Sequence, residues 1–113
     1  MRKEVSSEDQ VAQSVHLLSR HAHVLLILAK DPMVTIREIS FVLDVTERTV
    51  LRILNQLEEQ GFLHIERRGR NNSYRVLLDA ESSSRFEKGC TVRDVVGLVK
   101  SQEHINEEPV EGA

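Results

Sequence analysis

Arginine is concentrated in residues 64–75, a stretch with four arginines against the single acidic residue Glu66. The guanidinium group is permanently charged and can donate two parallel hydrogen bonds to one phosphate or to the edge of guanine. Two further arginines, Arg48 and Arg52, are four residues apart, so they share one side of a helix if their stretch is helical. This pattern favours binding to a polyanion such as double-stranded DNA. The four arginines of the first stretch are Arg67, Arg68, Arg70 and Arg75.

A β-hairpin is expected to carry these four arginines. In this part of the chain the apolar period is two rather than 3.6, because Leu63 and Ile65 alternate with polar residues and so do Tyr74 and Val76. Residues 69–72, between the two runs, are all residues that favour turns or tolerate them. The sequence therefore predicts an antiparallel hairpin with an arginine-rich tip.

Two short helices joined by a tight turn are predicted just before the hairpin. Thr35 and Glu38 form a capping box, in which hydroxyl and carboxylate satisfy each other's free backbone N–H groups. A turn at Asp44 follows, and Thr46 caps the second helix. Gly61 is expected to end that helix in the left-handed conformation. The inward-facing residues are expected to be Ile36, Ile39 and Leu43 in the first helix and Val50, Ile53, Leu54 and Leu57 in the second.

A longer helix is predicted before this pair. It begins near Ser6 or Ser7 and ends before Pro32, but Ser19 could instead cap a fresh helix, and the sequence leaves that choice open. The segment is apolar on two sides, which is more than a small domain needs for its own core. We therefore expect one side to contact the core and the other to contact a partner.

A further helix is predicted after the hairpin, with Thr91 and Asp94 forming a second capping box. Its valine face could pack on its own domain or on the same helix of a second subunit. Together with the first helix, it favours a homodimer, because two-fold symmetry is the commonest oligomeric arrangement and suits palindromic DNA. The expected dimer contacts are Val11, Val15, Leu18, Val92, Val95, Val96 and Val99.

The order of these elements predicts an α+β winged helix-turn-helix fold, with a three-helix core, a β-hairpin wing and additional N- and C-terminal helical segments. Residues 7–78 are expected to form the domain. A flexible N-terminus at 1–6 precedes it, and a linker at 79–90, a C-terminal helix at 91–101 and an acidic disordered tail at 102–113 follow it.

The composition is that of a small soluble protein, since 113 residues with 40% hydrophobic and 29% charged side chains suffice for one domain. No apolar run could span a bilayer and no signal segment is recognisable, so we expect a cytoplasmic protein without a membrane partner. The net charge is −3, but the last thirteen residues carry four glutamates and no lysine or arginine. The remainder is therefore +1, and the arginine patch matters more than the total.

The sequence motifs give little support for metal sensing or for catalysis. The histidines are scattered, and no paired cysteines or two-histidine helical motif with metal-ligand spacing is present, so we expect no metal or other cofactor. The lone cysteine fits a reducing compartment and lacks a surrounding basic cluster that would activate its thiol. No glycine-rich phosphate loop or nucleophile elbow suggests an enzyme. The residues considered were His16, His21, His23, His64, His104 and Cys90.

The stretch 21–76 resembles the winged helix-turn-helix regulators of the MarR family and, more distantly, those of the ArsR family. The matching pieces are HAHVLL at 21–26, IREI at 36–39, VTER at 45–48, RI at 52–53, LEEQGFL at 57–63 and RRGRNNSYRV at 67–76. Their order is more specific than any one piece, and together they cover about half of the chain. The resemblance implies dimeric, sequence-specific DNA binding that regulates transcription, with the terminal helices in the dimer contact.

The resemblance also places the second helix of the pair in the major groove and the hairpin on the backbone or the minor groove. Arg48 and Arg52 are then expected at base edges or flanking phosphates, and Arg70 mainly at the backbone. The recognition-helix positions carried over are Thr46, Glu47, Arg48, Thr49, Arg52 and Gln56, and the wing positions are Arg67, Arg68, Arg70, Asn71, Asn72 and Arg75. Thr35 and Arg37 are added as phosphate contacts at the start of the preceding helix.

Four residues depart from the family pattern. Asp44 stands where glycine is usual, and Phe41, Val42 and Leu51 lie where polar side chains are common. Leu51 could contact a thymine methyl group, whereas Phe41 and Val42 suggest apolar surface that needs a cover. The alternative function is therefore a winged-helix module that binds another protein through these three apolar residues. A DNA affinity that falls steeply with salt would distinguish the first function from the second.

Overall fold

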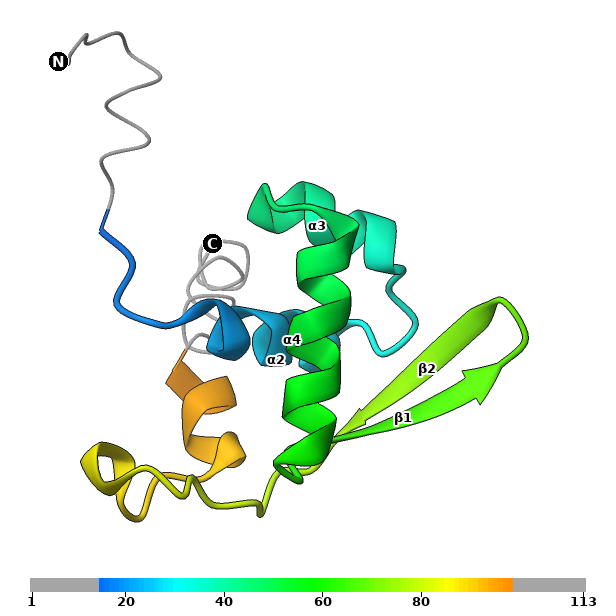
Figure 1. The fold of residues 1–113 in the computed structure, drawn as a ribbon. Coiled ribbons are helices and arrows are strands. Elements are labelled where there is room, and N and C mark those ends of the chain that lie inside the picture. The colour runs from blue at the N-terminus through cyan, green and yellow to red at the C-terminus, as the bar shows by residue number, and fades with distance from the viewer. Residues whose placement is uncertain (1–14, 99–113) are drawn as a thin grey trace, which may run out of the picture.

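The computed structural model describes residues 15–98. Within them the chain forms helices and one two-stranded antiparallel hairpin, which confirms the predicted α+β class. Helix α4 crosses α2, and the hairpin starts at the C-terminal end of α4 and projects away from the helices (Figure 1). The elements are α2 (Arg20–Lys30), α3 (Ile36–Leu43), α4 (Glu47–Glu59), β1 (Leu63–Arg68), β2 (Asn71–Val76), the 3-10 helix η1 (Arg85–Glu87) and the helical residues 92–98.

Helix α2 begins afresh at Arg20. The Ser19 side chain caps it by accepting a hydrogen bond from the backbone N–H of Ala22 at 3.2 Å, and residues 15–19 are not helical. Of the two possibilities that the sequence left open, the break at Ser19 is therefore the one observed. Residues 6–14, where the longer helix was expected to start, lie outside the described part of the chain.

The helix-turn-helix follows the local signals of the sequence. Thr35 and Glu38 form the predicted capping box, with hydrogen bonds of 2.9 and 3.0 Å. Asp44 adopts the left-handed conformation, with φ 58° and ψ 49°, in the turn where the families that the sequence resembles usually have glycine. The Thr46 side chain then caps α4 by accepting from the backbone N–H of Thr49. These caps fix where α4 begins and therefore which of its residues face outward.

Helix α4 ends at a Schellman motif, which turns the chain directly into the wing. The N–H of Phe62 donates to the carbonyl of Leu57, the N–H of Gly61 donates to the carbonyl of Glu58, and Gly61 has φ 83°. The hairpin itself closes through a two-residue turn at 69–70, since Arg68 pairs with Asn71. Its first residue, a glycine with φ 60°, suits a type II′ turn.

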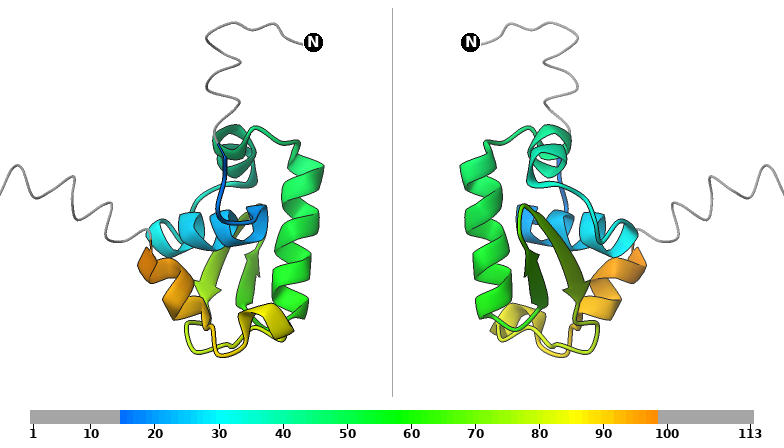
Figure 2. Two further views of the ribbon diagram at one scale, coloured as in Figure 1. Left: turned by 90° about the vertical axis from the view of Figure 1, so that its left-hand side faces the viewer. Right: turned by 90° about the vertical axis from the view of Figure 1, so that its right-hand side faces the viewer.

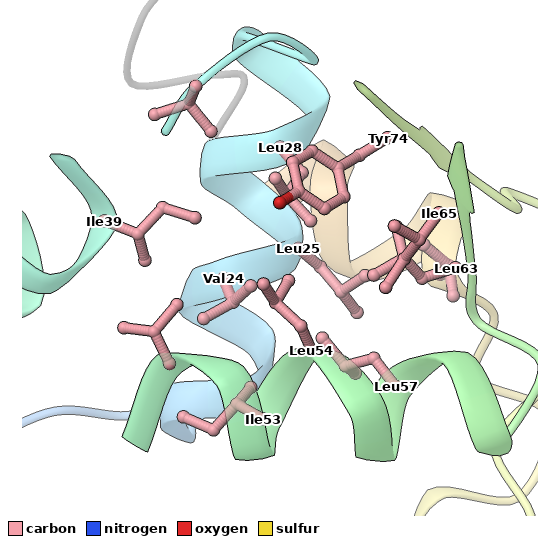
Figure 3. Close-up of a cluster of buried hydrophobic side chains, with 13 residues drawn as sticks. Val24, Leu25, Leu28, Ile39, Ile53, Leu54, Leu57, Leu63, Ile65 and Tyr74 are labelled. Atoms are coloured by element: carbon pink, nitrogen blue, oxygen red, sulfur yellow. The ribbon is translucent and has the colours of Figure 1, made fainter. Parts of the chain in front are cut away.

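The core lies between α2, α4 and the base of the wing (Figure 3). The backbone N–H of Tyr74 donates to the carbonyl of Pro32 at 3.0 Å, which ties β2 to the loop between α2 and α3. The predicted inward face of α4 is buried, as is Ile39 of α3. The buried core residues are Val24, Leu25, Leu28, Val34, Ile39, Val50, Ile53, Leu54, Leu57, Leu63, Ile65, Tyr74 and Val92.

Residues 79–90, predicted as a linker, form a closed loop that brings the chain back to the domain. Glu81 pairs with Thr91, and the N–H of Val92 donates to the carbonyl of Ala80 at 2.9 Å. Thr91 and Asp94 form the predicted second capping box. Helical residues 92–98 consequently lie beside α2 (Figure 2). The sequence pattern of serines and charges gave no sign of these backbone contacts, while the domain boundaries themselves stay predictions.

Candidate nucleic-acid interface

The exposed side of α4 carries a row of three polar residues. Since Val50, Ile53, Leu54 and Leu57 are buried, the opposite side of the helix faces solvent. Arg48 and Arg52 lie on it, as predicted from their spacing, and both are exposed. At 100° per residue Asn55, seven residues after Arg48 and three after Arg52, falls on the same side of the helix, about 20° from Arg48 and about 60° from Arg52. The sequence prediction missed Asn55, although the same helical period would have found it. We call Arg48, Arg52 and Asn55 the α4 row.

Three of the predicted recognition-helix residues have structural roles at the start of α4. The Thr46 hydroxyl accepts from the backbone N–H of Thr49 and also donates to the Thr49 hydroxyl, both at 3.1 Å. Glu47 is an exposed residue of the first turn, where a carboxylate interacts favourably with the helix dipole. These residues lie beside the α4 row and orient the helix start.

Gln56, predicted to face DNA, is engaged elsewhere. Its side-chain oxygen forms a hydrogen bond of 2.7 Å with Nε2 of His21 on α2. The two residues are 35 positions apart in the chain, so no local pattern could reveal the contact. Gln56 therefore joins α4 to α2 rather than extending the α4 row.

The two faces of the wing carry different residues. Leu63, Ile65 and Arg67 alternate along one face, and the register pairs Arg67 with Asn72, so both lie on the face that continues the core. Arg68, Asn71 and Arg75 lie on the other face, and Arg70 lies in the turn. Arg75 pairs with His64 near the base of the hairpin, far along the strand from the tip. These arginines are close together in the sequence, but the fold places them on different faces and at different ends of the hairpin.

Arg67 points back to α4 and pairs with Glu58. Its Nη2 lies 3.1 Å from one carboxylate oxygen and its Nη1 lies 3.4 Å from the other. The hydrogen bond from Arg67 lowers the pKa of Glu58 from its usual value, and the same bond raises the pKa of Arg67. The positive charge of Arg67 is thus balanced within the chain, which leaves Arg68, Arg70 and Arg75 as the wing arginines without an ion pair in the described part of the chain.

A groove of about 300 Å³ separates the wing from the start of α3. Thr35 stands at the helix N-terminus on one side, and Arg70 and Asn72 stand on the other. Free N–H groups at a helix N-terminus and an arginine both suit a phosphate. The structure therefore brings together Thr35 and the tip of the wing, which the sequence predicted separately as backbone contacts, whereas Arg37 lines a different groove.

The position of the wing relative to α4 completes the geometry. The hairpin diverges from the C-terminal end of α4, and its tip is level with the N-terminal half of the helix (Figures 1 and 2). That half carries Arg48 and Arg52. Basic side chains from two elements thus lie at one level of the molecule, an arrangement typical of a DNA-binding surface.

Comparison with known proteins agrees with this geometry. Residues 19–99, most of the chain, match the penicillinase repressor family. The chain belongs to that family. It is a winged-helix DNA-binding transcriptional regulator. No curated protein matches the sequence.

Two solved structures share the fold of this penicillinase repressor family member. Streptococcus pneumoniae FabT in complex with DNA is 22% identical, with a TM-score of 0.54 over 95% of this chain and 71% of FabT. Lactococcus lactis ZitR, a zinc-responsive MarR family member, is 19% identical, with a TM-score of 0.52 over 88% of this chain and 63% of ZitR. The likeness concerns the fold, and it confirms the resemblance to MarR-type winged helices.

An exposed apolar patch is the basis of the alternative protein-binding function. In this family member the side chains of Phe41 and Val42 are 86% and 64% exposed and line a groove of about 570 Å³ between α3 and the end of α2. Leu51 is 46% exposed on α4 and does not line that groove. The three residues therefore do not share one pocket.

The residues predicted to form the dimer contact fall into different environments. Val92 is only 4% exposed and belongs to the core of its own domain, so its prediction as a subunit contact is wrong. Val96 packs against the same core, and Val95 lines a groove of about 420 Å³ with Leu18. Val15 is 84% exposed. Val11 and Val99 lie outside the described residues.

The histidines and the cysteine form no metal-binding group within residues 15–98. His16 and His23 meet edge to face, with ring centroids 5.3 Å apart. Partial burial lowers the pKa of His23, and the charges of His16 and Arg20 lower it further. Burial raises the pKa of the Cys90 thiol, with Asp94 acting in the same direction, so the thiol is less reactive than a free one. In the same part of the chain, no helix has both the length and the apolar character needed to cross a membrane.

Proposed function

We propose that this chain regulates transcription by inserting the N-terminal half of α4 into the major groove, with the wing tip on the adjoining backbone or minor groove. The observation that carries this proposal is the exposed α4 row standing level with the arginine-bearing tip. Arginine in the major groove reads guanine, and asparagine reads adenine. FabT, which shares the fold, was solved in complex with DNA. Binding to chromosomal DNA would place the protein in the cytoplasm.

A salt-titrated binding experiment tests the proposal. Affinity for random duplexes is measured from low to physiological salt, and selection with sequencing then identifies the preferred site. We expect affinity to fall steeply with salt, because phosphate binding releases counterions. Weak affinity with little response to salt would refute DNA binding and favour the protein-binding module.

The matched variants are Arg52→Ala and Arg85→Ala. Arg52 lies in the α4 row, whereas Arg85 is an equally exposed arginine of η1, outside the proposed interface. Loss of a bidentate base contact should cost about 1–3 kcal/mol of specific binding and relax the sequence preference. Arg85→Ala should bind as the parent does. Equal behaviour of the two variants would place base recognition elsewhere.

We further propose that the regulator binds as a homodimer. Val15 is exposed and belongs to the predicted contact, whereas Val92 is buried in the domain core. Val15→Asp should therefore shift the sedimentation equilibrium toward monomer without a change in thermal stability. Val92→Ala should lower the stability and leave the assembled mass unchanged. A Val15→Asp variant that keeps the mass of the parent would exclude this segment from the dimer contact.

A further inference from the structure

The outer half of β1 projects beyond the core. Leu63 and Ile65 are buried, but residues 66–71 are exposed on both strands. A two-stranded hairpin is only marginally stable by itself, so contacts with the rest of the domain must hold this half in one orientation. On β2, Tyr74 is tied to the loop after α2. On β1, the contact that reaches past Ile65 is the pair of Arg67 with Glu58.

The Glu58–Arg67 pair joins the two elements that the proposed function places on DNA. Glu58 lies in the last turn of α4, and Arg67 lies one residue before the end of β1. Both carboxylate oxygens face the guanidinium group, at 3.1 and 3.4 Å. Two of the five N–H donors of Arg67 are directed at Glu58, so these two cannot bind a phosphate while the pair is formed.

Neighbouring groups favour the charged form of Glu58. The hydrogen bond from Arg67 is the largest influence and lowers the pKa of Glu58, and the backbone of Ile65 and the ring of His64 act in the same direction against the effect of burial. The pair is therefore an ion pair under the conditions in which the protein would meet DNA.

We infer that Glu58 is a positioning residue that withholds Arg67 from the DNA backbone and holds the wing at a fixed angle to α4. This inference rests on the proposed function. An arginine on a phosphate strengthens binding to every sequence alike. Pairing Arg67 inside the chain limits that sequence-independent affinity. The pair also fixes the orientation of the wing relative to α4. This favours binding to the preferred site, because only the complex with that site requires the wing in one orientation.

The test uses Glu58→Gln with Glu59→Gln as its matched control. Each variant removes one negative charge from the last turn of α4, but Glu59 forms no ion pair within the described residues. Salt dependence is measured on a selected duplex and on an unrelated duplex. In Glu58→Gln the released Arg67 should add a phosphate contact, which steepens the slope of log affinity against log salt by about 0.9 for each protomer. Glu59→Gln should keep the slope of the parent.

A third variant, Arg67→Gln, separates the two roles of the pair. It removes the wing contact without supplying a new phosphate contact. We expect the slope of the parent and a lower ratio of specific to non-specific affinity, and the same ratio should fall in Glu58→Gln. A slope that flattens in Arg67→Gln would show that Arg67 already binds phosphate and would overturn the inference. So would equal slopes for Glu58→Gln and Glu59→Gln.

The failure of this inference can be told apart from failure of the proposed function. If the parent chain binds duplexes with a steep salt dependence but Glu58→Gln leaves the slope unchanged, only the role of Glu58 is refuted. If the parent shows no salt-dependent affinity, both are refuted. Thermal unfolding of each variant confirms that the domain remains folded during the measurement.

Discussion

The separation of the wing arginines makes a quantitative prediction for Arg70→Gln and Arg75→Gln. Both substitutions remove one exposed positive charge from the same hairpin. Arg70 lies in the turn beside the N-terminus of α3, whereas Arg75 pairs with His64 near the base. If position rather than net charge determines DNA contact, only the first substitution should change the binding of phosphate.

The magnitude follows from the exposed arginines that are predicted to contact the backbone. Arg37, Arg68 and Arg70 are exposed and form no ion pair within residues 15–98. A dimer would then make about six such contacts, for a slope of about −5.4 and an affinity loss of about a thousandfold between 50 and 200 mM salt. Arg70→Gln removes two contacts and should flatten the slope to about −3.6. Arg75→Gln should leave it near −5.4.

Fluorescence anisotropy with a labelled duplex at four or more salt concentrations measures these slopes directly. The two variants have the same net charge, so a long-range electrostatic effect would change both alike. Equal flattening in the two variants would show that the wing acts as a diffuse positive charge, and the assignment of contacts from strand register would then be wrong. No flattening in either would remove the wing from the interface.

Three further predictions concern the folded domain. Ile53→Ala in the core should destabilise it by about 2–5 kcal/mol in urea unfolding, whereas Leu51→Ala on the exposed side of the same helix should change stability by about 0.5 kcal/mol or less. Because pairing with Arg67 lowers the pKa of Glu58 in the folded chain, the stability it contributes should be fully present above the ordinary value of 4.5 and lost as pH falls through the lowered one; Arg67→Gln should abolish this pH dependence. The lowered pKa of His23 means that the unfolded chain binds its proton first, so stability should fall as pH drops below 6.5, and an NMR titration should find the ring more than half neutral at pH 6.5.

The elements that the sequence predicted well are those set by local chemistry. A capping box needs only residues three apart, and the Thr35–Glu38 box forms as expected. The end of α4 at Gly61 and the turn at Asp44 likewise depend on a single backbone position. The buried face of α4 follows from the helical period alone. Interactions between residues a few positions apart can therefore be predicted from the sequence before any tertiary contact is known.

The parts of the site that the sequence did not predict depend on contacts between distant segments. The bond between Gln56 and His21 joins positions 35 apart. The burial of Val92 depends on how the loop at 79–90 closes. For Arg67 the sequence could not reveal the ion-pair partner, but it could reveal the face of the strand on which the side chain lies. It shares strand parity with Leu63 and Ile65, so alternation already placed it on the inner face.

The distribution of charge along α4 constrains how the helix can meet DNA. Arg48 and Arg52 lie in its N-terminal half, and Glu58 and Glu59 lie in its last turn. Phosphates would be attracted to the first half, where the helix dipole is also positive, and repelled by the second. In the proposed complex the helix would therefore enter a groove with its N-terminal end and keep its C-terminal end outside. Pairing with Arg67 neutralises Glu58 in that acidic end, so fewer unpaired carboxylates accompany the wing when its tip approaches the same duplex.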